Sequence, residues 1–458
     1  MNNDTNITNF NFWRVLKLVA PTISMMSFLS LYTVIDGTFI ANFVGTDALS
    51  SSNIAFPFVN FLLGISIMLG SGGCAFVMKK VGEDKLEEAR KAFSTIVLFA
   101  IAIGVVIMVV SSIFLDDIII MLGATENLHQ YCKDYLFFFI VFTIPTILKF
   151  IMEQFLVAIN KSGIALILTI LGGILNILLD YIFIYLMGYG IEGASFATGL
   201  GYTIPSIIGI IIFMNKKHML HFVNPFSSSG SGSDNNNSSN ADTNIQTILK
   251  TCSNGSSEMI TQLSNGLITF LYNYIMLKYL GEDGVASITI ILYIQFLVSS
   301  IFMGYSVGIA PQISFFYGNK DTQILKKIIS ISFIFITLSS LIMYGLSIVL
   351  ADILVGWFAE PNTGVFDITL DGLKKYSLAF LFMGFPIFIS AMFTAFSNGK
   401  VSAFISFSKT LIFQSIGIIS FPFLFGATSV WYAVLMAQIL GCMLCLYFYK
   451  KYKAIYQY

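Results

Sequence analysis

The chain has 458 residues, of which 56% are hydrophobic and only 10% are charged, and its formal net charge at pH 7 is zero. This composition excludes an ordinary water-soluble surface, and the absence of a net positive charge argues against nucleic acid as a partner. The five cysteines are scattered through hydrophobic segments and the three histidines show no metal-ligand spacing, so neither a disulfide framework nor a metal centre built on them is expected. We therefore predict an all-α integral membrane protein, with the lipid bilayer as its main partner.

Hydrophobic segments long enough to cross a bilayer recur along the whole chain. A spanning α-helix needs about 20 hydrophobic residues. The twelve predicted spans cover residues 13–38, 49–78, 92–115, 132–158, 164–187, 191–214, 250–279, 285–317, 328–350, 373–397, 402–424 and 428–449. These segments lack the polar stripes that a water-soluble helical bundle would need, so we predict twelve transmembrane helices.

The loops between these spans differ in charge on the two sides of the membrane. Most Lys and Arg fall in the terminal segments and in loops on the same side as the termini. The loops of the other side contain several acids and only four cations, which are Lys133, Lys278, Lys374 and Lys375. The positive-inside rule then places both termini in the cytoplasm. The polar start of the chain lacks a basic region and a cleavage site, so we expect no signal peptide. The prediction is a multi-pass protein of the plasma membrane.

A polar segment separates the sixth and seventh predicted helices. It runs SSSGSGSDNNNSSNADTN from Ser227 to Asn244 and cannot bury a core. We predict a flexible cytoplasmic linker over residues 223–246, and a phosphorylation or partner-binding role for it stays open. The linker divides the chain into an N-terminal lobe, residues 1–222, and a C-terminal lobe, residues 247–458, of six helices each.

The two lobes are related in sequence. Gly45-Thr-Asp47 recurs as Gly281-Glu-Asp283, and Gly82 recurs as Gly318 at the same separation along the chain. Since each lobe has an even number of helices, the two repeats share one membrane orientation. Parallel repeats of this kind are a transporter architecture, in which substrate is handled between the halves. A channel is less consistent with the sequence, because no Gly-rich re-entrant filter is apparent.

Two carboxylates lie at membrane depth in the N-terminal lobe. Asp180 is roughly 28 Å along its helix from the cytoplasmic Lys161, and Asp36 roughly 33 Å from Arg14, so the two lie at similar height. Asn176 shares a helix face with Asp180. Acids in hydrocarbon are costly, and two of them in one dry site need a proton or a Na⁺ between them. We predict a cation site, although each Asp capping a helix end or pairing with a neighbour is the simpler alternative.

Other polar residues fall inside the predicted helices. Lys149 and Glu153 are spaced to form an ion pair, for which a structural role is favoured over ligand binding. Lys409 has no acid near it in sequence, and it could face a central cavity. Pro21 lies in the same helix as Asp36, so cation binding could be coupled to bending of that helix.

Three motifs give the chain a resemblance to a known family. Val34 to Gly45 reads VIDGTFIANFVG and is similar to a "V-D-T-x-F-V-G" signature. Gly172 to Asp180 resembles an N-x-x-x-D motif, and Gly190 to Thr198 is similar to the "G-x-x-G-A-A-x-A-T" opening of a sixth helix. With its twelve helices, central linker and two halves, the chain resembles the MATE (multidrug and toxic compound extrusion) family of the MOP superfamily, in its DinF- and MepA-like branch.

The resemblance implies an antiporter that exports organic, often cationic, compounds in exchange for inward H⁺ or Na⁺. Positions matching Asp36, Asn176, Asp180 and Thr198 hold the coupling cation in the family, and their oxygen donors suit Na⁺ if Na⁺ is the coupling ion. Tyr135 matches a family position near that site. The implied partners are small organic substrates; we expect no cofactor beyond the coupling ion, and a monomer.

Glu258 is the intramembrane acid of the predicted seventh helix. It resembles a cation ligand of the NorM-like branch, which would make it a second site. This chain departs from that branch because no acid lies mid-way along the tenth helix to partner it. Structural hydrogen bonding within Asn254 to Glu258 is an equal alternative.

Two other functions are less consistent with the sequence than export. A flippase for lipid-linked saccharides or lipids of the same superfamily would need a cavity rich in Arg and Lys, whereas Lys149 and Lys409 are the only cations inside the predicted helices and away from the helix ends. An intramembrane enzyme is not expected, since no H-E-x-x-H motif occurs.

Overall fold

The structure, a computed structural model, describes residues 11–226 and 240–458. Its N-terminal half contains α1 (Phe12–Phe43), α2 (Thr46–Gly82), α3 (Leu86–Ile113), α4 (Leu115–Met121), α5 (Glu126–Val141), α6 (Thr143–Ala158), α7 (Ser162–Asp180), the π-helix η2 (Tyr181–Leu186) and α8 (Gly190–Met214). Its C-terminal half contains α9 (Asn240–Gly318), α10 (Thr322–Val349), α11 (Ala351–Gly356), α12 (Gly364–Tyr376), η3 (Ser377–Ala379), α13 (Phe380–Ala395), α14 (Gly399–Phe407), the π-helix η4 (Ser408–Phe413), α15 (Gln414–Phe425), η5 (Ala427–Tyr432) and α16 (Ala433–Tyr456).

Twelve crossings can be traced through the described helices. Ten helices are long and hydrophobic enough to span a membrane, and the bent pair of α5 and α6 makes one more span. The α9 helix has 79 residues, far more than one crossing needs, and its backbone leaves helical geometry at Gly281 (φ 68°, ψ −160°). Glycine adopts this positive φ without steric penalty, so α9 is two arms that meet at Gly281. The predicted all-α, twelve-helix fold is confirmed.

Three predicted boundaries were wrong in detail. The predicted fourth helix, 132–158, is broken at Phe142, where α5 and α6 meet at an angle of 55°. The predicted tenth helix, 373–397, starts earlier, at Gly364. The predicted linker, 223–246, ends too late because α9 already begins at Asn240, while residues 227–239 lie outside the described part.

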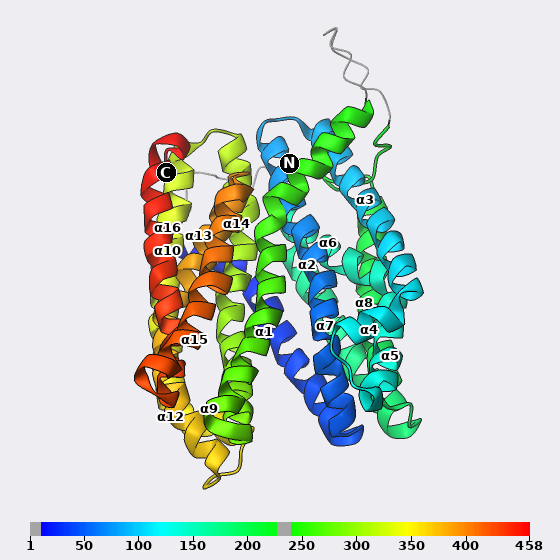
Figure 1. The fold of residues 1–458 in the computed structure, drawn as a ribbon. Coiled ribbons are helices and arrows are strands. Elements are labelled where there is room, and N and C mark those ends of the chain that lie inside the picture. Colours follow the sequence, from blue (N-terminus) through cyan, green and yellow to red (C-terminus); the bar gives the residue numbers. More distant parts are fainter. Residues whose placement is uncertain (1–10, 227–239) are drawn as a thin grey trace.

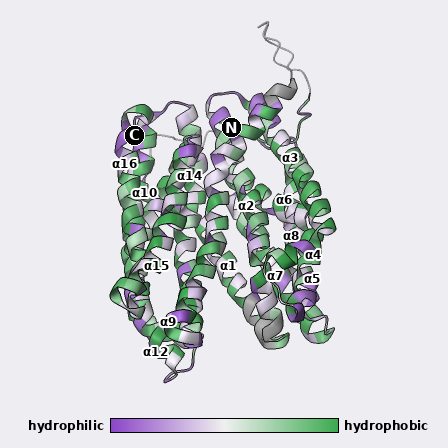
Figure 2. Cartoon of the chain, in the orientation of Figure 1, coloured by the Kyte–Doolittle hydropathy of each residue, from purple (hydrophilic) through white to green (hydrophobic). Residues whose placement is uncertain are grey.

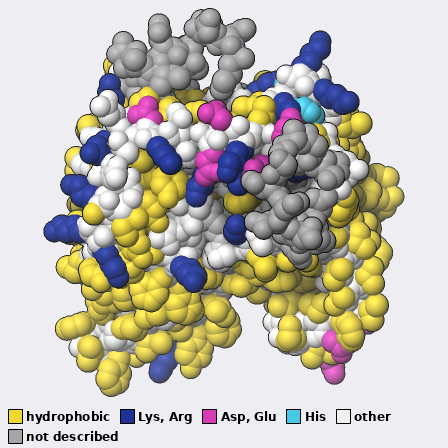
Figure 3. All heavy atoms as spheres, turned by 90° about the horizontal axis from the view of Figure 1, so that it is seen from above, with side chains coloured by type: hydrophobic (Ala, Val, Ile, Leu, Met, Phe, Trp, Pro, Cys, Tyr) yellow, Lys and Arg dark blue, Asp and Glu magenta, His cyan; other side chains and the backbone are white. Residues whose placement is uncertain are grey.

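Both ends of the described chain lie on the same end of the bundle. We call this end, which holds the start of α1 at Phe12 and the end of α16 at Tyr456, the terminal face (Figure 1). The N-terminal half lies mainly on the right of Figure 1 and the C-terminal half on the left. Hydrophobic residues cover the middle of the bundle in Figure 2, and Figure 3 shows Lys and Arg side chains spread over the terminal face.

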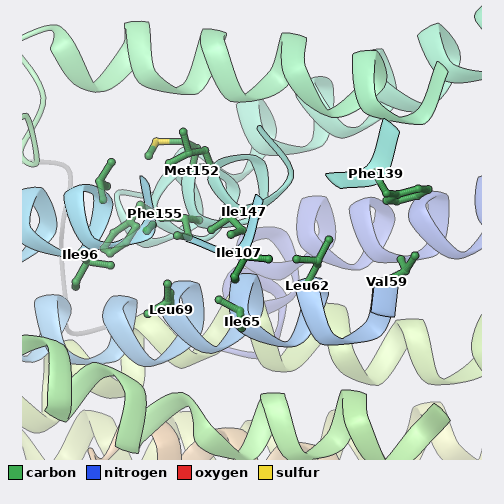
Figure 4. Packing of buried hydrophobic residues seen from close by; sticks show 14 of the residues in the cluster. Val59, Leu62, Ile65, Leu69, Ile96, Ile107, Phe139, Ile147, Met152 and Phe155 are labelled. Carbon is green, nitrogen blue, oxygen red and sulfur yellow. The ribbon is translucent and has the colours of Figure 1, made fainter. Parts of the chain in front are cut away.

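The N-terminal half has a close-packed hydrophobic core. Figure 4 shows side chains of α2, α3, α5 and α6 meeting there, among them Leu62, Ile96, Phe139 and Phe155. Leu62 and Phe155 have no exposed surface. Helices in lipid gain little from hydrophobicity alone, so tight packing of this kind holds the half together.

The two halves pack against each other in the part of the bundle nearer the terminal face. A side chain at Gly255 of α9 would overlap the carbonyl oxygen of Met68 in α2, and one at Gly318 would overlap that of Lys79. At Gly304, a Cβ atom would lie 2.7 Å from the carbonyl oxygen of Thr22 in α1. These backbone-to-backbone contacts need glycine, and they close the bundle toward the terminal face.

Glycine also lets α7 lie against α8. A Cβ atom at Gly172 would lie 2.6 Å from the carbonyl oxygen of Gly201, so Gly172→Leu should push the two helices apart. We expect a loss of about 1–3 kcal/mol of stability, measured as a lower thermal unfolding temperature in detergent. Gly163→Leu in the same helix is the matched control, because nothing lies within 4 Å of its Cβ position. Equal unfolding temperatures for the two variants would contradict this packing.

Candidate cation-binding site

Two neighbouring glycines of α7 bring three helices together at the candidate site. Gly172 faces α8, and Gly173 faces α1, where a Cβ atom would lie 2.6 Å from Cε1 of Phe28. With no side chains to hold the helices apart, α1 and α8 both lie directly on α7. Polar residues farther along the same helices are thereby brought into one place.

Asp36 of α1 and Asp180 of α7 are neighbours. Their carboxyl groups are near enough to share a hydrogen bond when one of them holds a proton. Asp180 has no exposed surface. Both of its carboxylate oxygens, and Oδ1 of Asp36, are buried and accept no hydrogen bond from any described residue. Acceptors buried in this way are costly, so the pair is suited to holding a proton or a cation.

Helix capping does not explain these acids. The α1 helix continues past Asp36 to Phe43, and the chain stays helical after Asp180 through η2. An acid in mid-helix gains no hydrogen bonds from free backbone N–H groups. The simpler alternative from the sequence, that each Asp caps a helix end, therefore does not fit the backbone.

Asn176 and Thr198 join the acids. The side-chain amide of Asn176 donates to Oγ1 of Thr198 over 3.2 Å, and Thr198 in turn donates to the carbonyl oxygen of Ala194 over 3.0 Å. The Asn176 Oδ1 atom is buried without a donor among the described residues. Together with the acids it makes a cluster of oxygens that lacks a positive partner, and oxygen donors of this kind suit a hard cation.

Tyrosines line the same site. Tyr135, in the second half of α5, is buried and within electrostatic reach of Asp36 and Asp180. Sequence reasoning missed Tyr32 and Tyr202, whose hydroxyl oxygens lie 3.2 Å apart. The sequence could have pointed to them through their helical spacing, because Tyr32 lies one turn before Asp36 and Tyr202 lies one turn after Thr198.

The remaining candidate residues are not part of this cluster. Pro21 lies in an unbroken stretch of α1, near the terminal face. Glu258 of α9 and Lys409 of η4 lie within reach of each other's charge, so the acid that Lys409 lacked in sequence is Glu258. No group of three or more His, Cys, Asp or Glu side chains that could hold a metal occurs in the described parts of the chain. A Na⁺ at Asp36 and Asp180 would depend on Asn176 and Thr198 for further oxygens.

Known proteins match this chain along nearly its whole length. A family model described as MatE matches residues 21–182 and 258–419, one stretch in each half. The chain is 25% identical over 428 residues to "Multidrug export protein MepA" of Staphylococcus haemolyticus, covering 91% of this chain and 89% of that protein. The MepA of Staphylococcus aureus strain NCTC 8325 is 24% identical over 430 residues, with the same coverage.

Solved structures share the fold. One titled as the outward-facing conformation of a multidrug resistance MATE family transporter of the MOP superfamily superposes with a TM-score of 0.87 and 19% sequence identity. The match covers 97% of this chain and 96% of that one. A MATE transporter of Vibrio cholerae gives a TM-score of 0.86 with 17% identity, covering 97% of each chain.

Proposed function

Because the chain belongs to the MatE family of multidrug efflux transporters, we propose that it is a secondary antiporter. It exports organic compounds, cationic ones among them, in exchange for H⁺ or Na⁺ that moves inward. The observation that carries this proposal is the buried pair of Asp36 and Asp180, whose oxygens have no donor among the described residues. Coupling requires that this pair bind the cation with a different affinity in each state of the transporter.

The proposed orientation puts the terminal face in the cytoplasm of a cell whose plasma membrane the protein spans. The abundance of Lys and Arg on that face supports it (Figure 3). The halves are in contact near the terminal face at Gly255 and Gly318, so the bundle is closed toward the cytoplasm. This closed arrangement of the terminal face corresponds to the outward-facing state of an alternating-access cycle. In that state the coupling cation reaches Asp36 and Asp180 from outside.

Two lysines inside the helices bear on the rival flippase function. Lys149 is buried against Glu153, with 3.1 Å between Nζ and Oε2, and Lys409 lies within reach of the charge of Glu258. Lys149 is therefore taken up by its ion pair, and Lys409 alone does not supply the several cations that a pyrophosphate-linked cargo would need. The names of the relatives, multidrug export proteins, also favour export of organic compounds.

The proposal is tested by efflux of ethidium, a fluorescent organic cation, from cells that lack their own exporters. Cells expressing the protein should lose ethidium faster than cells with an empty vector. They should lose that advantage when a protonophore and a Na⁺ ionophore are added together. Efflux that survives both treatments, or no efflux beyond the vector, would contradict a cation-coupled exporter of organic cations.

A further inference from the structure

The N-terminal half contains a second buried charge centre that the cation site does not include. Lys149 and Glu153 lie one turn apart on α6, with side chains only 3% and 6% exposed and 3.1 Å between Nζ and Oε2. Burying an ion pair costs desolvation energy that packing of hydrophobic residues would avoid. Ionisable residues inside a membrane are therefore expected to have a function.

The surroundings of this pair hold each charge in place. Oε1 of Glu153 accepts a hydrogen bond from Thr169 of α7 over 2.7 Å. The Lys149 ammonium lies 4.0 Å from the ring centroid of Phe150 and 5.3 Å from that of Tyr202. Lys149 Nζ does not form a hydrogen bond with Glu153 although it lies near Oε2, so the two side chains are held together mainly by their opposite charges. The lysine therefore sits between Glu153 and the tyrosine that lines the cation site.

Two tyrosines link this centre to the acids. The Tyr202 hydroxyl oxygen lies 3.2 Å from that of Tyr32, and both tyrosines lie within electrostatic reach of Asp36 as well as Glu153. Counted along the helices from Lys161, Glu153 lies roughly 12 Å and Lys149 roughly 18 Å from the terminal face, against roughly 28 Å for Asp180. A column of polar and ionisable side chains thus runs from the cation site toward the terminal face.

We propose that Lys149 and Glu153 are positioning residues that set how tightly the Asp36–Asp180 pair holds its coupling cation. This inference rests on the proposed function, since it assumes that a cation binds there. In the dry interior, the positive charge of Lys149 repels a bound cation and the negative charge of Glu153 attracts it. While the two are paired, their effects largely cancel. Binding then stays weak enough for the cation to be released.

Other ionisable groups reach the same column and are left unchanged in the test. They are tyrosines from four helices, of which Tyr293 belongs to the C-terminal half: Tyr32, Tyr135, Tyr202 and Tyr293. All of them are neutral near pH 7. The balance of charge therefore depends on the two acids of the cation site together with Lys149 and Glu153.

The test measures cation binding to the full-length protein in detergent, with Na⁺ and H⁺ as separate probes. A cation that binds only the folded state raises its unfolding temperature once the cation concentration exceeds the dissociation constant, so the concentration at which the rise begins reports affinity. Glu153→Gln leaves Lys149 unbalanced and should need about tenfold more Na⁺ or H⁺. Lys149→Gln should need about tenfold less, and the double variant should return to within about threefold of the wild type.

Two further variants separate charge from folding. Exchanging the residues (Lys149→Glu with Glu153→Lys) keeps an ion pair but puts the acid nearer Asp180, so binding should tighten about threefold or more. The matched control is the pair Lys375 and Asp371, which has the same spacing but lies on the surface, with 2.6 Å between Nζ and Oδ2. Neutralising both residues of that pair should leave the concentration at which the rise begins unchanged.

The outcomes distinguish this inference from the proposed function. If the wild type responds to a cation but the exchanged pair and Glu153→Gln respond at the same concentration, the centre is only structural and the inference is wrong. A double variant as far displaced as the single ones would overturn it too. If neither Na⁺ nor H⁺ stabilises the wild type, it is the proposed cation coupling that fails, and the inference fails with it.

Discussion

Replacing Asp180 with Asn should abolish ethidium efflux, lowering its rate by about 100-fold, to the level of cells without the protein. Asp180 has no exposed surface, and its two carboxylate oxygens have no donor among the described residues. Asparagine keeps the shape of the side chain but cannot take up a proton or carry the charge that holds Na⁺. Cation binding would then no longer favour one state of the transporter over the other.

The same variant should not lose stability. A buried carboxylate without a donor costs free energy in the folded protein, so Asp180→Asn should unfold at an equal or higher temperature. The control for efflux is Asp371→Asn, an acid with 54% of its side chain exposed and paired with Lys375. That control should export normally. If Asp180→Asn retained more than half of the wild-type efflux, Asp180 would not be a coupling residue.

Replacing Gly255 with Leu should prevent the bundle from closing at the terminal face. A Cβ atom at Gly255 would overlap the carbonyl oxygen of Met68, and backbone cannot move aside as a flexible side chain can. The closed state should therefore lose about 3 kcal/mol, which lowers the ratio of closed to open molecules by roughly 150-fold. Efflux should fall by more than about tenfold, since only one half of the cycle stays accessible.

The measurement is a distance between spin labels at Asp84 and Lys320, which line one cavity of about 610 Å³ on the terminal face. The wild type should give a short distance, and Gly255→Leu a longer one. Gly345→Leu in α10 is the control, because nothing lies within 4 Å of its Cβ position. An unchanged short distance in Gly255→Leu would show that this contact does not hold the bundle closed.

Much of the fold follows from the sequence because lipid imposes a simple rule of length and hydrophobicity. Residues such as Lys161 and Arg14 mark the ends of helices, and counting along each helix from them predicts that Asp180 and Asp36 lie at similar depth. The two are indeed neighbours. Their role as a coupling site stays a prediction, since geometry alone does not measure cation binding.

Features set by packing between distant helices could not be predicted. The break between α5 and α6 lies at Phe142, whose ring occupies the place that a side chain at Gly199 of α8 would take. Pro145, in the first turn of α6, has no N–H to complete a helical hydrogen bond, so the sequence signals a bend here but neither its angle nor the partner of Phe142. The hydroxyl contact of Tyr32 with Tyr202 was missed for the same reason, because tyrosine is common in membrane helices and its partner is 170 residues away.

The central claim is that a cation bound by Asp36 and Asp180 drives export, and proteoliposomes test it most directly. Purified protein is reconstituted, and ethidium transport is driven by a pH gradient or by a Na⁺ gradient, each applied alone. At least one gradient should move ethidium against its own concentration difference in the wild type, and neither should do so in Asp36→Asn. Uphill transport by Asp36→Asn equal to that of the wild type, or transport by the wild type that ignores both gradients, would contradict the claim.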